Sequence, residues 1–355
     1  MIFKILVLLM STVILLGCRE KEQPEPQPEP LLEIRGADMS FLPEVRQSGL
    51  VIRNNANLPE DMLATLQNSG ANVVRLRLWN NPATPTSGLE TVRTLSAEIK
   101  NRGMKVMLSL HYSDSWADPG KQTLPALWQG LPFTVLLDSV HRFTHRVVSA
   151  IRPEYIQIGN EINSGLLWPH GHYNQPEQMR SILQTAIAAT RSGSPNTKII
   201  LHFAGLNGAN HFFTRVSTLD YDIMGISYYP KWHGSDLSNL QQVLTQLANI
   251  HQKPIFIAET SYPFTMGWND WTNNVVGEAG HLVPGFAATP EGQRDFLREI
   301  RRIITEVPRG IGFVYWGAEW ISYRGPQAAD GSTWENQALW DFNNRALPAL
   351  TVFGE

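Results

Sequence analysis

Two glutamates that end apolar segments are the first candidates for chemistry in this chain. Glu161 ends the segment QIGNE, and Glu259, far along the sequence, ends the segment IFIAE. A carboxylate at the end of a buried strand is unfavourable unless it is paired or used. Either glutamate alone would indicate half of a structural ion pair. Two together can divide acid–base work, because one carboxyl group can hold a proton while the other attacks or accepts one.

The elements that must position the two glutamates alternate regularly. From Leu31 onward, short apolar runs alternate with segments of helical periodicity. The apolar runs are continuous in Val, Ile and Leu, which predicts parallel strands that are buried on both faces. The predicted strands are Glu33–Asp38, Asn72–Trp79, Lys105–Tyr112, Tyr155–Ile162, Lys198–Ala204, Asp222–Tyr229, Pro254–Thr260 and Gly310–Trp316.

The segments between the predicted strands have the pattern of amphipathic helices. One of them starts at Thr289-Pro290, and Gly70 and Gly103 are placed to end two others. Eight strand–helix units in residues 31–355 predict a single (β/α)8 barrel with long loops after the strands. A doubly wound open sheet is the alternative, but no GxGxxG sequence follows the first strand to support it.

All eleven tryptophans lie at predicted strand ends or in the segments that follow them. Tryptophans that only fill the core would instead include several on the inner faces of helices. In a (β/α)8 barrel, the C-terminal strand ends form the mouth where chemistry takes place. A rim of aromatic side chains there fits stacking against sugar rings, although we expect some of the eleven to pack loops.

The barrel gives the two glutamates a common location. Glu161 ends the fourth predicted strand and Glu259 the seventh, so their side chains can face each other across the mouth. Retaining glycosidases use such a pair, one acid and one nucleophile, at a separation of about 5–5.5 Å. Together with Asn160 directly before Glu161, the pair predicts glycoside hydrolysis.

Six motifs carry a resemblance to a known family. They are GADMS at 36–40, RLRLW at 75–79, HYSDSWADPGKQ at 111–122, GNEI at 159–162, SYYPKWHG at 227–234 and ETSYP at 259–263. The sequence resembles the clan of retaining (β/α)8 glycosidases and, more narrowly, glycoside hydrolase family 53, the endo-β-1,4-galactanases, from about Leu31 to the C-terminus. The resemblance implies hydrolysis of the galactan and arabinogalactan side chains of pectin by double displacement.

The resemblance also implies roles for the central residues. Glu161 is implied to be the acid/base, Glu259 the nucleophile, and Asn160 a ligand of the sugar 2-hydroxyl. An arginine at the end of the second strand is expected beside the nucleophile, where its positive charge keeps Glu259 ionised. We expect only one of Arg75 and Arg77 to point inward and choose Arg77, which lies nearer the strand end.

Further substrate contacts are expected around the mouth. Asp38 ends the first strand and either contacts the sugar or braces Arg77. His111 is expected to contact the sugar, although a histidine that only anchors a loop is the plainer interpretation. The remaining substrate-binding residues that we expect are Trp79, Trp116, Tyr228 or Tyr229, Trp232 and Trp316.

No catalytic metal and no required cofactor are expected. Bacterial members of the resembled family often hold a calcium ion in the loop after strand seven. Here that loop, residues 266–274, contains one acid, Asp270, where several oxygen ligands are needed. Structural calcium is therefore in doubt.

The first residues have the pattern of a lipoprotein signal. Lys4 precedes an apolar run too short for a membrane span, and the run ends in LLGC with Cys18, the only cysteine. We expect a signal peptide at 1–17, a diacylated Cys18 and a Pro/Glu-rich linker to residue 30, followed by the catalytic domain at 31–355. An ordinary signal peptide with an incidental cysteine is the alternative. The expected location is the cell envelope of a bacterium, as an outer-membrane or cell-surface lipoprotein that contacts the membrane only through its anchor.

The expected partner is β-1,4-galactan, bound by a monomer. A formal net charge of −3 argues against nucleic acid. Another endo-glycanase of the same clan, cutting mannan, xylan or glucan, is the first alternative, because a fold does not determine the substrate. The second is a surface glycan-binding lipoprotein without catalysis. Such a protein should have replaced one of the two glutamates, and both are present.

Overall fold

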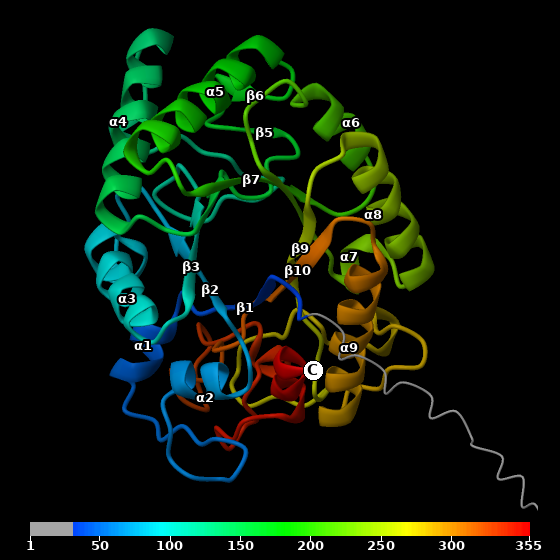
Figure 1. Cartoon of the computed structure of the whole chain (residues 1–355). Coiled ribbons are helices and arrows are strands. Elements are labelled where there is room, and N and C mark those ends of the chain that lie inside the picture. The colour runs from blue at the N-terminus through cyan, green and yellow to red at the C-terminus, as the bar shows by residue number, and fades with distance from the viewer. Residues whose placement is uncertain (1–30) are drawn as a thin grey trace, which may run out of the picture. The chain divides into compact units, whose positions relative to one another are not determined.

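The computed structural model describes residues 31–355. The predicted signal peptide, Cys18 and the linker to residue 30 lie outside the described residues. Eight parallel strands close into a barrel in the order β1-β10-β9-β8-β7-β4-β3-β2. The predicted (β/α)8 barrel is therefore confirmed, and the open doubly wound sheet is wrong. Figure 1 shows the strands at the centre of a ring of helices.

The eight predicted strands are all present, most of them one or two residues shorter than expected. The barrel strands are β1 (Ile34–Asp38), β2 (Val73–Leu78), β3 (Lys105–Leu110), β4 (Tyr155–Ile158), β7 (Lys198–Ala204), β8 (Ile223–Ser227), β9 (Ile255–Thr260) and β10 (Gly310–Tyr315). The largest difference is at β4, which ends at Ile158 rather than at residue 162. Two short strands, β5 (Gly165–Leu166) and β6 (Gly171–His172), pair antiparallel in the loop after β4.

Helices occupy most of the connections. They are α1 (Leu42–Gln47), α2 (Met62–Asn68), α3 (Leu89–Asn101), α4 (Phe133–Ile151), α5 (Pro176–Gly193), α6 (Ala209–Arg215), α7 (Pro230–His233), α8 (Leu237–His251) and α9 (Pro290–Glu306). Short 3-10 helices lie at Pro85–Ser87, Ala126–Trp128, Ala279–His281, Glu335–Gln337 and Pro348–Gly354. Within residues 31–355, no helix combines the length and apolar character needed to cross a membrane.

The helix boundaries follow the predicted chemistry. The Thr289 side chain accepts a hydrogen bond from the Gly292 N–H, and Pro290 occupies the first turn of α9, as expected for that pair. Gly70 and Gly103 follow the ends of α2 and α3 with φ angles of 95° and 77°. Such left-handed conformations favour glycine, which explains why both helices end there.

The core has two layers. The inner layer takes at least one buried side chain from each of the eight barrel strands: Ile34, Val73, Met107, Tyr155, Ile200, Ile223, Phe256, Ala258 and Val314. A cluster with members from every strand must fill the inside of the barrel. The outer layer packs the other strand faces against the helices. The barrel is thus a rigid support for the segments at its C-terminal end.

The seam where β10 meets β1 depends on a glycine. Gly312 pairs with Ile34 across this seam, and its φ is 149°. A Cβ atom at this position would overlap the Ile34 carbonyl group. We therefore expect Gly312→Ala to lower the free energy of unfolding by about 3 kcal/mol, measured by denaturant titration.

The matched control for this prediction is Gly280→Ala, because a Cβ atom at Gly280 would meet nothing within 4 Å. Its free energy of unfolding should change by less than about 0.5 kcal/mol. Equal unfolding midpoints for the two variants would contradict the assignment of strain to the seam.

Candidate active site

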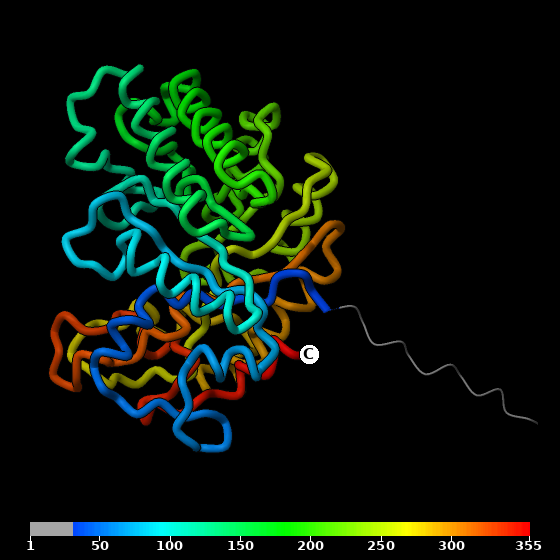
Figure 2. The backbone as a smooth tube through the Cα atoms, turned by 60° about the vertical axis from the view of Figure 1, so that its left-hand side comes forward, coloured from blue at the N-terminus to red at the C-terminus, as the bar shows by residue number. Residues whose placement is uncertain are grey.

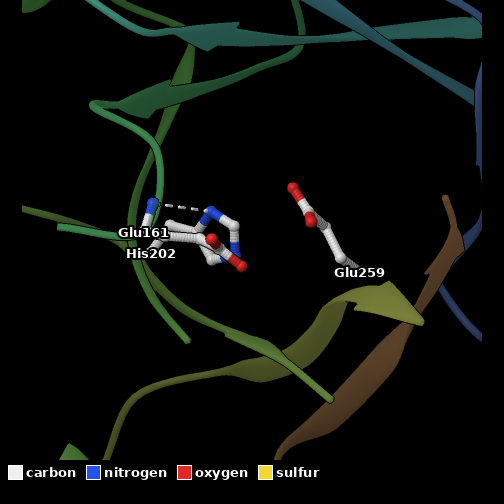
Figure 3. Close-up of side chains that lie close together, drawn as sticks. All are labelled: Glu161, His202 and Glu259. Atoms are coloured by element: carbon white, nitrogen blue, oxygen red, sulfur yellow. Dashed lines mark hydrogen bonds between the residues drawn. The ribbon is translucent and has the colours of Figure 1, made fainter. Parts of the chain in front are cut away.

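The C-terminal ends of the strands surround a cavity of about 510 Å³. Glu161 and Glu259 both line it. One carboxylate oxygen of each lies within 4.8 Å of the other and of a His202 ring nitrogen. Figure 3 shows the two glutamate side chains on opposite sides of this space, with His202 beside Glu161. The predicted pair is therefore assembled at the mouth of the barrel.

Glu161 reaches the cavity from a tight bend rather than from a strand. Gly159 has a φ of 81° and Glu161 one of 46°. A left-handed conformation is strained for a residue with a side chain, and it persists where the surrounding structure imposes it. Here the Glu161 N–H donates to His202 Nδ1 over 3.3 Å, which fixes the bend.

Arg75 holds the second glutamate. Its Nη2 donates to Glu259 Oε1 over 2.6 Å, and its Nη1 donates to Asp38 Oδ2 over 2.7 Å. Nη2 also reaches Asn160 Oδ1 over 2.8 Å, and Nε donates to Gln157. The guanidinium is almost completely buried, with a side-chain exposure of 1%.

The choice of Arg77 as the partner of the nucleophile was therefore wrong. Arg75 and Arg77 are two residues apart and share a face of β2, so the expectation that only one points inward fails: both line the cavity. They differ in depth. Arg75 is level with Asp38 in the β1–β2 register, whereas Arg77 lies nearer the rim.

Arg77 sits in an aromatic cage. Its guanidinium carbon lies 4.5 Å from the Phe41 ring centroid, 4.5 Å from Trp79 and 4.0 Å from Trp116. Nε and Nη2 donate to the Ser87 hydroxyl. Burial lowers the pKa of Arg77 to about 10, so the side chain is still charged at neutral pH. Cation–π contacts and a hydroxyl thus take the place of an ion pair.

The surroundings of Glu161 and Glu259 affect the pKa values of the two carboxyl groups differently. Burial, together with the nearby charge of Glu259, raises the pKa of Glu161 to about 8. Burial also raises the pKa of Glu259, but the Arg75 charge and a 2.9 Å hydrogen bond from the Tyr229 hydroxyl oppose that rise. At neutral pH the proton therefore resides on Glu161 and the negative charge on Glu259.

Glu161, His202 and Glu259 are close enough to suggest a metal site, but their contacts do not fit one. Nδ1 of His202 accepts the Glu161 N–H, and Nε2 is 2.8 Å from the Ser227 hydroxyl. The Arg75 cation contacts Glu259 directly. A metal ion would have to displace these bonds and tolerate a like charge beside it.

The expected substrate-binding residues divide into two groups. Those that line the cavity are Arg77, His111, Trp116, Asn160, Tyr229, Trp232 and Trp316. His111 also accepts the Ala117 N–H at Nδ1, so it anchors a loop while facing the cavity. For this residue the two interpretations are therefore compatible.

Three of the expected residues lie behind the cavity wall instead. Asp38 contacts Arg75, not Arg77. Trp79 packs against Arg77, and its indole N–H points to His111 over 3.4 Å. Tyr228 donates its hydroxyl to the Gly234 carbonyl, which leaves Tyr229 as the tyrosine at the cavity. These three residues support the site without lining it.

Sequence reasoning missed several residues that complete the site. Trp320 and Trp334, which the sequence placed on the aromatic rim but not among the named substrate contacts, pack edge-on against Trp316 at 5.1 and 4.6 Å and line the cavity with it. His202 supports the bend at Glu161, and a signal for it existed, because a histidine interrupts the apolar run IILHFA.

Glu319 also was not predicted. It lies in the long loop after β10, where no sequence pattern indicates a buried residue. Its side chain is buried, with 1% exposure, and Oε1 accepts the Phe41 N–H over 2.7 Å. Burial, together with the charge of Asp38, raises the pKa of Glu319 to about 8. It is therefore a second neutral carboxylic acid near the site at neutral pH.

The loop after β9 does not fit a calcium site. Oδ1 of Asp270 accepts the Thr272 N–H over 2.7 Å, and Oδ2 accepts the Ser332 N–H over 2.9 Å. Both oxygens of its one carboxylate are thus engaged with the backbone, and this carboxylate ties the loop to the segment after β10. Coordination of a calcium ion would require several free oxygen ligands.

Comparisons with known proteins agree with this geometry. The model of the family described as Glycosyl hydrolase family 53 matches residues 34–353. A relative from Cellvibrio japonicus named arabinogalactan endo-β-1,4-galactanase is 33% identical, over 90% of this chain and 89% of its own length.

Solved structures show the same similarity. The family 53 catalytic domain from Ignisphaera aggregans has a TM-score of 0.87 and 34% identity, covering 93% of this chain and 98% of that one. A fungal β-1,4-galactanase has a TM-score of 0.80 and 30% identity, covering 91% of this chain and 99% of its own. The chain therefore belongs to glycosyl hydrolase family 53 and is a glycoside hydrolase.

Proposed function

We propose that the protein is a retaining endo-β-1,4-galactanase that cleaves the galactan and arabinogalactan side chains of pectin. The observation that carries the proposal is the facing pair Glu161 and Glu259, with oxygens within 4.8 Å of each other and with the Arg75 guanidinium bonded to Glu259. That separation matches a direct attack by one carboxylate and leaves too little room for the water molecule of an inverting enzyme. Galactan as the substrate is supported by the names of the relatives.

The proposed first step is the cleavage of the glycosidic bond. Glu161 gives its proton to the glycosidic oxygen, while a Glu259 carboxylate oxygen attacks the anomeric carbon and forms an ester. The leaving chain departs as an alcohol. Arg75 and the Tyr229 hydroxyl hold Glu259 in place through this step. Asn160 lines the cavity beside the pair and is expected to bind the sugar 2-hydroxyl.

The proposed second step releases the sugar. Glu161, now ionised, takes a proton from a water molecule, whose oxygen attacks the anomeric carbon and breaks the ester to Glu259. Two inversions at the same carbon give overall retention of the β configuration. The first step requires a protonated Glu161, and the second step returns the proton to it. The raised pKa of Glu161 keeps this proton in place at neutral pH before the cycle starts.

The proposal that the enzyme cuts within the chain, rather than from its end, is supported by the tryptophans that line the cavity. Trp116, Trp316 and Trp334 line the cavity, and Trp232, which is 53% exposed, extends the lining to the surface. A stacking surface that continues out of the cavity suits a chain that passes through the site rather than one that ends in it.

We also propose that the chain is a bacterial cell-envelope lipoprotein, anchored through Cys18. The support is the LLGC sequence that ends the short apolar run, followed by a linker rich in Pro and Glu.

The substrate is tested by comparing initial rates on potato-type galactan, mannan, xylan and carboxymethylcellulose. Galactan should be hydrolysed fastest, with an early mixture of oligosaccharides and a rapid fall in viscosity. Galactose as the sole early product would refute the endo mode. Faster hydrolysis of mannan, xylan or a glucan would refute the substrate.

Arg75→Lys should lower kcat by at least about 100-fold, because a lysine cannot bond Asp38, Asn160 and Glu259 together. Arg77→Lys is the matched control and should act mainly on KM, since Arg77 makes no bond to Glu259. Steady-state kinetics at pH 6 measure both, with thermal unfolding to verify folding. A larger loss of kcat in Arg77→Lys would contradict the assignment.

Glu161→Ala should slow polymer cleavage by about 100- to 10,000-fold while changing little the first step on a dinitrophenyl galactobioside, whose leaving group needs no proton. In the unmodified enzyme, kcat/KM for the polymer should fall as pH rises through about 8, where Glu161 loses its proton. The dinitrophenyl substrate should lack this alkaline decline. Equal slowing of both substrates would exclude Glu161 as the acid.

Cys18→Ala should move the protein from the membrane fraction to the soluble fraction of the native host. The specific activity should not change, because residue 18 precedes the barrel. Fractionation followed by immunoblotting measures the distribution. Retention of the variant in the membrane fraction would argue against a lipid anchor.

A further inference from the structure

Three tryptophans of the described chain expose more than half of their side chains. They are Trp232 at 53%, Trp268 at 51% and Trp271 at 66%. All three lie in the segments after β8 and β9, two strands that pair directly. Trp232 belongs to the cavity lining, but Trp268 and Trp271 do not. Exposed large aromatic side chains that gather at one place mark a binding surface.

The loop that carries Trp268 and Trp271 is fixed by its backbone. The Trp271 N–H donates to the Ala328 carbonyl over 3.0 Å, and the Asn269 N–H donates to Glu335 Oε1 over 2.6 Å. Asp270 Oδ2 accepts a hydrogen bond from the Ser332 N–H. The loop thus holds its shape without burying its two indole rings, and a preorganised surface loses little entropy when it binds.

The same contacts place this loop against the cavity wall. The segment that holds it, from Ala328 to Glu335, includes Thr333 and Trp334, which line the cavity. The Val275 N–H donates to the Thr333 carbonyl over 2.9 Å. Figure 2 shows the yellow segment after β9 and the orange segment after β10 running side by side at one end of the barrel. The loop that carries the two exposed indoles therefore lies beside the segment that lines the cavity.

We propose that Trp268 and Trp271 form a distal platform that binds the β-1,4-galactan chain outside the catalytic cavity. The proposal rests on the proposed function for the identity of the polymer. The apolar C–H face of a galactose ring stacks on an indole, and such contacts require no charge. The one carboxylate of the loop, Asp270, is only 3% exposed and bonds to the backbone, so the surface suits a neutral glycan.

A distal platform affects affinity and not chemistry. It touches no reacting atom, and only a chain long enough to leave the cavity can reach it. Its contacts are the same in the ground state and in the transition state, so they lower KM for the polymer without changing kcat. A short substrate that fits within the cavity gains nothing from them.

The test compares the double variant Trp268→Ala/Trp271→Ala with the unmodified enzyme on long galactan and on nitrophenyl β-galactobioside. KM for long galactan should rise about tenfold, with kcat unchanged, and both constants for the galactobioside should stay the same. Trp268→Phe/Trp271→Phe should restore much of the affinity, since it retains aromatic rings. Leu127→Ala, at a 71% exposed apolar residue in the loop after β3, is the matched control and should change nothing.

Two results would overturn the platform. One is an unchanged KM for long galactan in the double variant of an enzyme that cleaves galactan, which leaves the proposed function intact. The other is an equal loss on the polymer and on the galactobioside, which would indicate damage to the cavity itself. Failure of the unmodified enzyme to cleave galactan would instead refute the proposed function, and the polymer assigned to the platform with it.

Discussion

The arrangement of the site depends on the buried guanidinium of Arg75. Removing a cation from water is strongly unfavourable unless opposite charges and hydrogen-bond acceptors replace the lost hydration. Here Asp38 and Glu259 supply the charges, while Gln157 and Asn160 supply further acceptors. These partners come from β1, from β4 and the bend that follows it, and from β9, so one side chain ties together the strand ends that carry the chemistry.

Charge balance around this cation explains why the two glutamates differ. Around it lie one further buried cation, Arg77, the buried acids Asp38, Glu259 and Glu319, and the partly covered Glu161. Four ionised carboxylates against two cations would leave two uncompensated charges at low dielectric. The two acids that no arginine contacts directly are Glu161 and Glu319, and burial raises the pKa of each to about 8. The proton that Glu161 donates in catalysis is therefore retained because the buried carboxylates outnumber the buried arginines.

Much of the fold could be predicted because its signals are local. Continuous apolar runs gave the eight strands, and the barrel that they imply placed Glu161 and Glu259 together. The choice between Arg75 and Arg77 failed because the two share a face and differ only in depth, which depends on the register of β2 against β1. Trp79 was misplaced because its ring packs against Arg77 instead of lining the cavity. Between Tyr228 and Tyr229, only packing decides which ring faces the cavity. Glu319 accepts a hydrogen bond from Phe41, which is 278 residues away in the sequence. No local sequence pattern predicts a contact over such a separation.

The central claim is that Glu259, held ionised by Arg75, attacks the sugar directly. It is tested most directly by recording proton NMR spectra during the first minutes of galactan hydrolysis, before mutarotation equilibrates the products. The account predicts that the β anomer of the new reducing end appears first and the α anomer follows only slowly. Initial formation of the α anomer would mean a single displacement by water, and would contradict a nucleophilic role for Glu259.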